Sequence, residues 1–88
     1  MRDLTFRGES YDDFLSIFAS DKKLFKRLDK LIKEVRRTPF EGIGKPEDLK
    51  GNLSGLWSRR ITEEHRLVYE VRDESIVVVS CRGHYGDK

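Results

Sequence analysis

The sequence predicts an α+β fold in which two helices pack on one face of an antiparallel sheet. Three observations lead to this prediction. Residues 10–37 carry apolar side chains at helical spacing, residues 56–82 contain three strand-like runs, and a shorter strand-like run precedes the helices. The predicted element order is therefore β-α-α-β-β-β, and the 88 residues are expected to form one domain, 1–88.

The first strand is expected where Leu4 and Phe6 alternate with polar residues. Ser10 is expected to cap the first helix, and Ser20 with Asp21 to separate it from the second. Two helices joined so closely should form an antiparallel pair. The second helix has basic residues opposite an apolar stripe, which is formed by Leu24, Phe25, Leu28, Leu31, Ile32 and Val35.

Pro39 is expected to end the second helix and to begin a long loop over residues 38–55. Prolines and glycines punctuate this segment throughout. A loop of this length in a small domain is uncommon and is often functional. Residues 47–49 are expected to form a helical turn within it.

The remaining chain predicts three strands over residues 56–61, 66–72 and 75–82. Their connections are short and polar, so the strands should form an antiparallel meander.

Strand alternation assigns side chains of the last two strands to the two faces of the sheet. In the middle strand, Leu67, Tyr69 and Val71 are expected to face the helices, which places Arg66 on the other face. In the last strand the residues expected in the core are Val77, Val79 and Cys81, with Ser80, Arg82 and His84 on the opposite side.

The net charge is only +2, although 39% of the residues are charged, so composition alone does not indicate a nucleic-acid partner. The distribution is less even, because eight basic residues between residues 22 and 37 are opposed only by Asp29 and Glu34. Two interpretations remain open at this point. The basic residues form either the solvated face of an amphipathic helix or an electrostatic footprint for a polyanion.

Cys81 is the only cysteine, so an internal disulfide and a cysteine-based zinc site are not expected. The sequence also lacks an apolar run typical of a signal peptide or of a membrane span, which takes about 20 residues. These features favour a cytoplasmic protein without a cofactor.

Metal-independent RNA cleavage needs a base for the ribose 2′-hydroxyl, a cation for the phosphate and an acid for the departing 5′-oxygen. Glu47, Arg66 and His84 are candidates because each lies at a loop or at a strand end. Simpler explanations compete, namely a surface acid, an exposed strand arginine and a solvated histidine. His65 is interpreted as structural. From the residues alone, an RNA-binding domain with or without catalytic activity remains open.

Three segments, 36–50, 52–71 and 81–85, resemble the signature of the YoeB toxins in the RelE superfamily. They include the motifs Lys-Pro-Glu at 45–47, Glu-His-Arg-Leu-Val-Tyr at 64–69 and Cys-Arg-Gly-His-Tyr at 81–85. The resemblance implies a small sheet with two helices on one side, as in microbial ribonucleases, which agrees with the predicted element order.

The resemblance also implies roles for individual residues. Glu47 would be the general base, Arg66 would stabilise the phosphate, and His84 would be the general acid. Tyr85 would be its catalytic or base-positioning neighbour. Contact with RNA or the ribosome is expected at Lys45, Lys50, Trp57, Arg59 and Arg60, and Trp57 has packing in the core as an alternative role.

YoeB-like proteins cut messenger RNA in the A site of the 70S ribosome and are held inactive by a YefM-type antitoxin. The same activity, partner and homodimeric state are therefore expected here. Gly83, in place of a bulkier residue, and the tail at 86–88 depart from the family pattern. The alternatives are a ParE-type inhibitor of DNA gyrase and a plain RNA-binding module.

Overall fold

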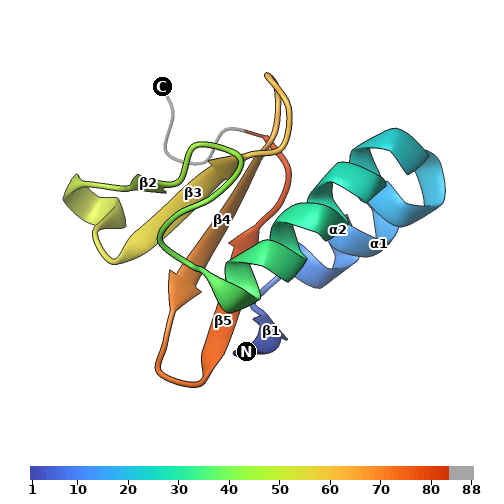
Figure 1. Cartoon of the computed structure of the whole chain (residues 1–88). Coiled ribbons are helices and arrows are strands. Elements are labelled where there is room, and N and C mark those ends of the chain that lie inside the picture. The colour runs from blue at the N-terminus through green and yellow to red at the C-terminus, as the bar shows by residue number, and fades with distance from the viewer. Residues whose placement is uncertain (84–88) are drawn as a thin grey trace.

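The computed structural model describes residues 1–83, which form a five-stranded sheet with two helices on one of its faces (Figure 1). The α+β class predicted from the sequence is confirmed. The helices are α1 (Ser10–Ser20) and α2 (Lys22–Arg37), and the sheet order is β1-β5-β4-β3-β2. The strands are β1 (Asp3–Phe6), β2 (Glu47–Asp48), β3 (Leu56–Arg60), β4 (Arg66–Val71) and β5 (Ser75–Ser80).

The sheet is mixed rather than antiparallel throughout. Strands β3, β4 and β5 form the predicted antiparallel meander, but β1 pairs with β5 in parallel. The expectation of a purely antiparallel sheet is therefore wrong. The alternation of Leu4 and Phe6 shows which face they occupy, but it carries no information on the direction of the neighbouring strand.

The core lies between the sheet and the helices. On α2, Leu28, Leu31 and Val35 are fully buried, as the apolar stripe predicted. They meet Leu67 and Tyr69 of β4, which face the helices as expected. Each such side chain contributes roughly 1.5–3 kcal/mol on leaving water, so the contact between the helices and the sheet stabilises the fold.

Strand β5 places a different set of residues in this core than the sequence predicted. Ile76, Val78 and Cys81 belong to the buried cluster, whereas Val77 and Val79 do not. The reason is an irregularity in the pairing, because Val68 pairs with Ser80 while the next residue of β4 pairs with Val78. The extra residue breaks the alternation, so side chains three residues apart can point to the same face.

The two helices begin differently. Ser10 was expected to cap α1, but its hydroxyl does not do so. It donates a buried hydrogen bond of 3.0 Å to the carbonyl of Val78 instead. Asp21 does cap α2, since its carboxylate accepts a hydrogen bond of 3.0 Å from the amide of Leu24. Helix α2 ends at Arg37, just before Pro39, as predicted.

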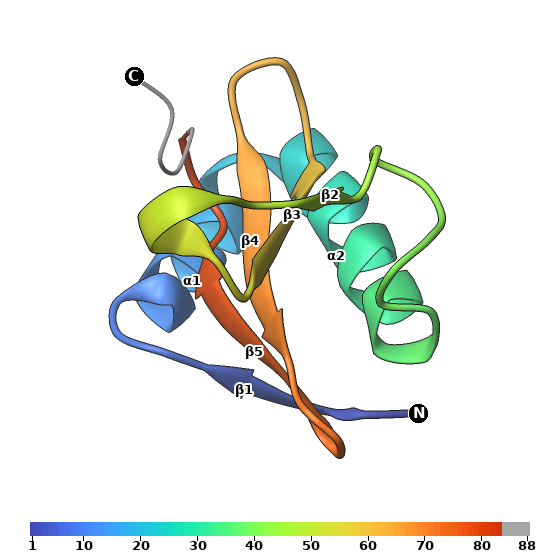
Figure 2. The same cartoon turned by 90° about the vertical axis from the view of Figure 1, so that its left-hand side faces the viewer.

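Residues 47–49 do not form the expected helical turn. Glu47 and Asp48 form the edge strand β2 instead, and a 3-10 turn follows at Gly51–Leu53. Seen at right angles to the first view, β2 and this turn lie in front of β3 and β4, with the helices behind the sheet (Figure 2). The segment that contains Glu47 thus lies on the side of the sheet away from the helices.

Candidate active site

A row of paired residues crosses the sheet from β2 to β5. Glu47 pairs with Ser58, Ser58 with Val68, and Val68 with Ser80. Residues directly opposite one another in neighbouring strands point to the same face. Val68 adjoins Tyr69, which faces the helices, so the row lies on the opposite face. We call this the outer face, and it carries the side chain of Glu47.

Two arginines share the outer face with Glu47. Arg60 of β3 and Arg66 of β4 lie directly opposite each other, each two residues from the Ser58–Val68 pair. Like charges in this position repel each other. No ion pair among residues 1–83 joins either guanidinium to a carboxylate. The pair therefore forms a local positive charge that favours an anion.

The orientation of Arg66 is set by the turn between β3 and β4. Its Nη1 donates to the carbonyls of Thr62, at 2.8 Å, and of Glu63, at 3.2 Å. A third acceptor, the carbonyl of His65, lies 3.3 Å away. The Nε and Nη2 donors make no hydrogen bond within the described part of the chain, and guanidinium donors of this kind are well suited to a phosphate.

The sheet geometry allows Glu47 and Arg66 to act on one group. They are separated by two strand spacings and two residues along the strand, which places their Cα atoms about 12 Å apart. A glutamate and an arginine that extend toward each other across this span can contact the same phosphodiester. Glu47 itself is exposed, so its carboxylate is accessible from solvent.

His84 and Tyr85, the other two predicted catalytic residues, lie outside the described residues 1–83. The residue before them is described, however. Gly83 accepts a hydrogen bond of 2.9 Å from the amide of Arg66 and donates one of 2.9 Å to Nδ1 of His65. Gly83, the residue before His84 in the sequence, is therefore fixed beside Arg66.

Arg59 does not belong to this site. Its side chain is fully buried on the helix side of the sheet. It donates hydrogen bonds to a carboxylate, a phenol and three carbonyls, namely Glu34 Oε1 at 2.5 Å, Tyr69 Oη at 3.1 Å, Thr38 O at 2.6 Å, Glu41 O at 2.8 Å and Ile43 O at 3.1 Å. The expectation that Arg59 contacts RNA or the ribosome is therefore wrong.

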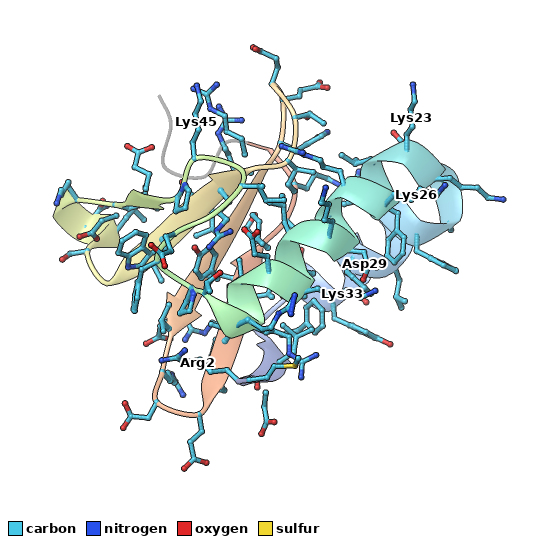
Figure 3. All side chains as sticks on the ribbon, in the orientation of Figure 1. Arg2, Lys23, Lys26, Asp29, Lys33 and Lys45 are labelled. Atoms are coloured by element: carbon cyan, nitrogen blue, oxygen red, sulfur yellow. The ribbon has the colours of Figure 1, made fainter. Side chains whose placement is uncertain are left out.

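The other residues expected to bind RNA differ in position. Trp57 is half-buried on the helix side, where its ring packs against Phe40 with centroids 5.1 Å apart. Of its two predicted roles, the geometry therefore favours packing. Lys45 is exposed on the loop before β2 (Figure 3), and the exposed Lys50 has its Nζ 3.7 Å from Asp48.

Cys81 contributes no nucleophile to the site. Burial raises the pKa of its thiol to about 11, and the nearby charge of Asp13 acts in the same direction. The thiolate is the reactive form of cysteine, so the neutral thiol is inert at physiological pH. Within residues 1–83 no group of three His, Cys, Asp or Glu side chains could hold a metal ion, and no helix there is suited to cross a membrane.

Comparisons with known proteins show the family of this chain. Residues 6–85 match the model of the YoeB-like toxin of bacterial type II toxin–antitoxin systems. The chain is 60% identical over 82 residues to toxin YoeB of Escherichia coli K12, covering 93% of this chain and 98% of that one.

Two solved structures from Staphylococcus aureus have the same fold. One is the heterotetrameric YoeB–YefM toxin–antitoxin complex, with 45% identity, a TM-score of 0.87, and coverage of 97% of this chain and 99% of that chain. The other is a YoeB dimer, with 46% identity, a TM-score of 0.86, and coverage of 96% and 98%.

Proposed function

The chain belongs to the YoeB-like toxins of bacterial type II toxin–antitoxin systems, and from this premise we propose that it is an endoribonuclease. Its substrate is messenger RNA in the A site of the 70S ribosome, and its cleavage inhibits translation. The observation that carries this proposal is the shared outer face of Glu47 and Arg66, a base and a phosphate-binding cation.

The proposed reaction is an attack by the ribose 2′-oxygen on the adjacent phosphorus. Glu47 removes the proton from the 2′-hydroxyl, and Arg66 stabilises the negative charge that builds on the phosphoryl oxygens. The bond from phosphorus to the 5′-oxygen breaks, leaving a 2′,3′-cyclic phosphate and a free 5′-hydroxyl. From the family motif, His84 protonates that oxygen with Tyr85 beside it, and the scheme needs no metal or other cofactor.

Arg60 extends the positive charge of this site. It lies opposite Arg66 on the outer face, where it can bind the phosphate next to the one that is cleaved. Lys45 and Lys50 are exposed on either side of Glu47 in the sequence. These three cations are proposed to bind the RNA backbone and to take no part in the bond-breaking step.

The partners are proposed from the relatives. The Staphylococcus aureus YoeB is found with YefM in one structure and as a dimer in another. We expect this chain to dimerise and to be held inactive by a YefM-like antitoxin. Action on ribosomes places the activity in the cytoplasm.

The decisive experiment is cleavage of a defined message on programmed ribosomes, with the new 5′ ends mapped. Glu47→Gln keeps the size of the side chain but removes the base, so we expect a rate about 10²–10⁴-fold lower. Asp48→Asn is the matched control, because it changes the other acid of the same two-residue strand, on the opposite face. This control should cleave at nearly the wild-type rate.

Two results would contradict the proposal. Full cleavage by Glu47→Gln would remove Glu47 from the chemistry, and cleavage of a message with a 2′-deoxy sugar at the cut site would exclude attack by the 2′-hydroxyl. Blocked translation with an intact message would indicate a binding inhibitor instead. A gyrase supercoiling assay would then test the ParE-type alternative.

A further inference from the structure

His65 makes a side-chain hydrogen bond that the proposed reaction does not use. Its Nδ1 accepts the amide proton of Gly83 over 2.9 Å, across 18 positions in the sequence. The carbonyl of the same glycine accepts from the amide of Arg66 over 2.9 Å. Both backbone groups of Gly83 are thus held by neighbouring residues at the start of β4, immediately before His84 in the chain.

The backbone of His65 is held in place by the turn between β3 and β4. The amide of His65 donates to the Thr62 hydroxyl over 3.1 Å, and its carbonyl accepts from the amide of Ile61 over 2.9 Å. The side chain is 22% exposed, so it has limited freedom. A half-buried ring carried on a backbone fixed in this way can support the segment bonded to it.

We propose that His65 is a positioning residue, which fixes the segment leading to His84 beside Arg66 as long as Nδ1 carries no proton. This inference rests on the proposed ribonuclease function. A ring nitrogen that accepts a hydrogen bond is unprotonated, so the neutral ring carries its proton on Nε2. Protonation of Nδ1 turns the acceptor into a donor that faces the Gly83 amide, and the hydrogen bond is lost.

Charged groups of both signs surround the ring. Nε2 lies 3.8 Å from the carboxylate of Glu64, and the guanidinium of Arg66 donates to the His65 carbonyl over 3.3 Å. The ring also lines a hollow between the start of α2 and the β3–β4 turn. The other charged residues of that hollow are Asp21, Lys23, Arg27 and Glu63.

Two substitutions separate the acceptor from the rest of the side chain. His65→Asn places an amide oxygen where Nδ1 stands and cannot be protonated in the working range, while His65→Leu removes the acceptor. Loss of one such hydrogen bond corresponds to about a 3- to 10-fold effect. We expect His65→Leu to lower kcat for ribosome-dependent cleavage by that factor with KM unchanged, and His65→Asn to restore most of it.

The pH profile distinguishes positioning from general support of the fold. The acidic fall in cleavage rate should move to lower pH in His65→Asn, because the amide does not titrate. Thr62→Val loosens the same turn without changing the ring, so its profile should keep the wild-type shape. Identical acidic limbs in the wild-type protein and His65→Asn would overturn the proposal.

The hydrogen bond itself can be measured without any activity. In the ¹⁵N-labelled wild-type protein, a scalar coupling between the Gly83 amide nitrogen and His65 Nδ1 should be present at neutral pH and disappear on acidification. Absence of this coupling at neutral pH would refute the inference even if His65→Leu failed to fold. If the coupling is present but Glu47→Gln cleaves normally, the hydrogen bond between His65 and Gly83 is confirmed and the proposed role of Glu47 in cleavage is contradicted.

Discussion

The buried guanidinium of Arg59 ties three parts of the chain together. It links β3 to Glu34 on α2 and to the carbonyls of residues 38, 41 and 43 in the loop before β2. Tyr69 completes the network by donating to the carbonyl of Pro39 over 2.8 Å. These hydrogen bonds hold the loop that leads to Glu47. Because Arg59 is buried on the helix side, it can influence the position of Glu47 only through this loop.

Glu34 is the acidic partner in this network, and its replacement should be costly. Burial raises the pKa of Glu34, but hydrogen bonds from the Ile43 amide and the Arg59 guanidinium outweigh burial and leave the pKa below its usual 4.5. Glu34→Gln leaves the buried guanidinium without a counter-charge. Because Glu34 is itself partly exposed, we expect a loss of about 2–3 kcal/mol at pH 7, below the range for fully buried pairs.

Urea unfolding across pH tests this prediction. A carboxyl whose folded pKa is lowered stabilises the protein above its unfolded pKa, and that contribution is lost as pH falls through the folded pKa. The gap between wild type and Glu34→Gln should therefore narrow below pH 4.5. Glu41→Gln is the control, because Glu41 offers Arg59 only its backbone carbonyl. An equal loss in this control would contradict the assigned role.

Sequence reasoning brings Glu47 and Arg66 forward as candidates because the proposed chemistry requires their side-chain types, and their roles stay a prediction. Strand alternation also predicts that Arg66 lies away from the core, and the strand pairing confirms that placement. Arg59 is misassigned because an arginine at a strand centre is usually exposed. Only its shared alternation with Trp57 indicates the buried face, and the acceptors that make burial favourable are distant in sequence.

The joint between the two helices depends on one residue, Asp21. Its amide donates to the carbonyl of Ile17 and ends α1, and its carboxylate accepts from the amide of Leu24 and begins α2. A single residue thus satisfies backbone groups of both helices. The antiparallel pair can turn back on itself without a longer connection, as Figure 1 shows.

Asp21→Ala should lower the free energy of unfolding by about 1 kcal/mol, since it removes the N-cap of α2. Asp29→Ala is the matched control on the same helix, because Asp29 only pairs with Lys33 over 3.0 Å at the surface. Such surface pairs contribute about 0.3–0.5 kcal/mol. Chemical denaturation of both variants measures the difference. Equal losses would show that the cap adds nothing beyond an ordinary surface charge.

At the level of elements, local residue spacing predicts a helix, but no local pattern predicts which strands pair or in which direction. Helix α2 follows from the spacing of its own apolar residues. Strand β2 is two residues long and exists only because it pairs with β3, so no local pattern predicts it. The parallel direction of β1 and the irregular register near Val79 likewise depend on partners remote in the sequence.

Across the whole molecule, positive charge lies on two opposite sides. Lys23, Lys26 and Lys33 extend from α2 away from the sheet (Figure 3), while Arg60 and Arg66 lie on the outer face. The molecule measures 33 × 31 × 24 Å, so the two charged surfaces lie on opposite sides of a small body. RNA that surrounds the protein, as in a ribosomal cavity, can contact both at once, which is consistent with the proposed dependence on ribosomes.

This arrangement predicts that α2 contributes to ribosome binding and not to chemistry. The triple variant Lys26→Gln, Lys30→Gln and Lys33→Gln removes three exposed charges from one side of the helix. We expect a higher KM for programmed ribosomes, an unchanged kcat, and a salt dependence of log KM that is shallower by about 2–3, since each phosphate contact contributes roughly 0.7–0.9 to the slope. The triple arginine variant keeps the charge and should behave as the wild type. A lower kcat in the glutamine variant at unchanged KM would instead indicate that the helix takes part in the catalytic step. Unchanged values of both kcat and KM would indicate that the basic residues of α2 form only a solvated surface.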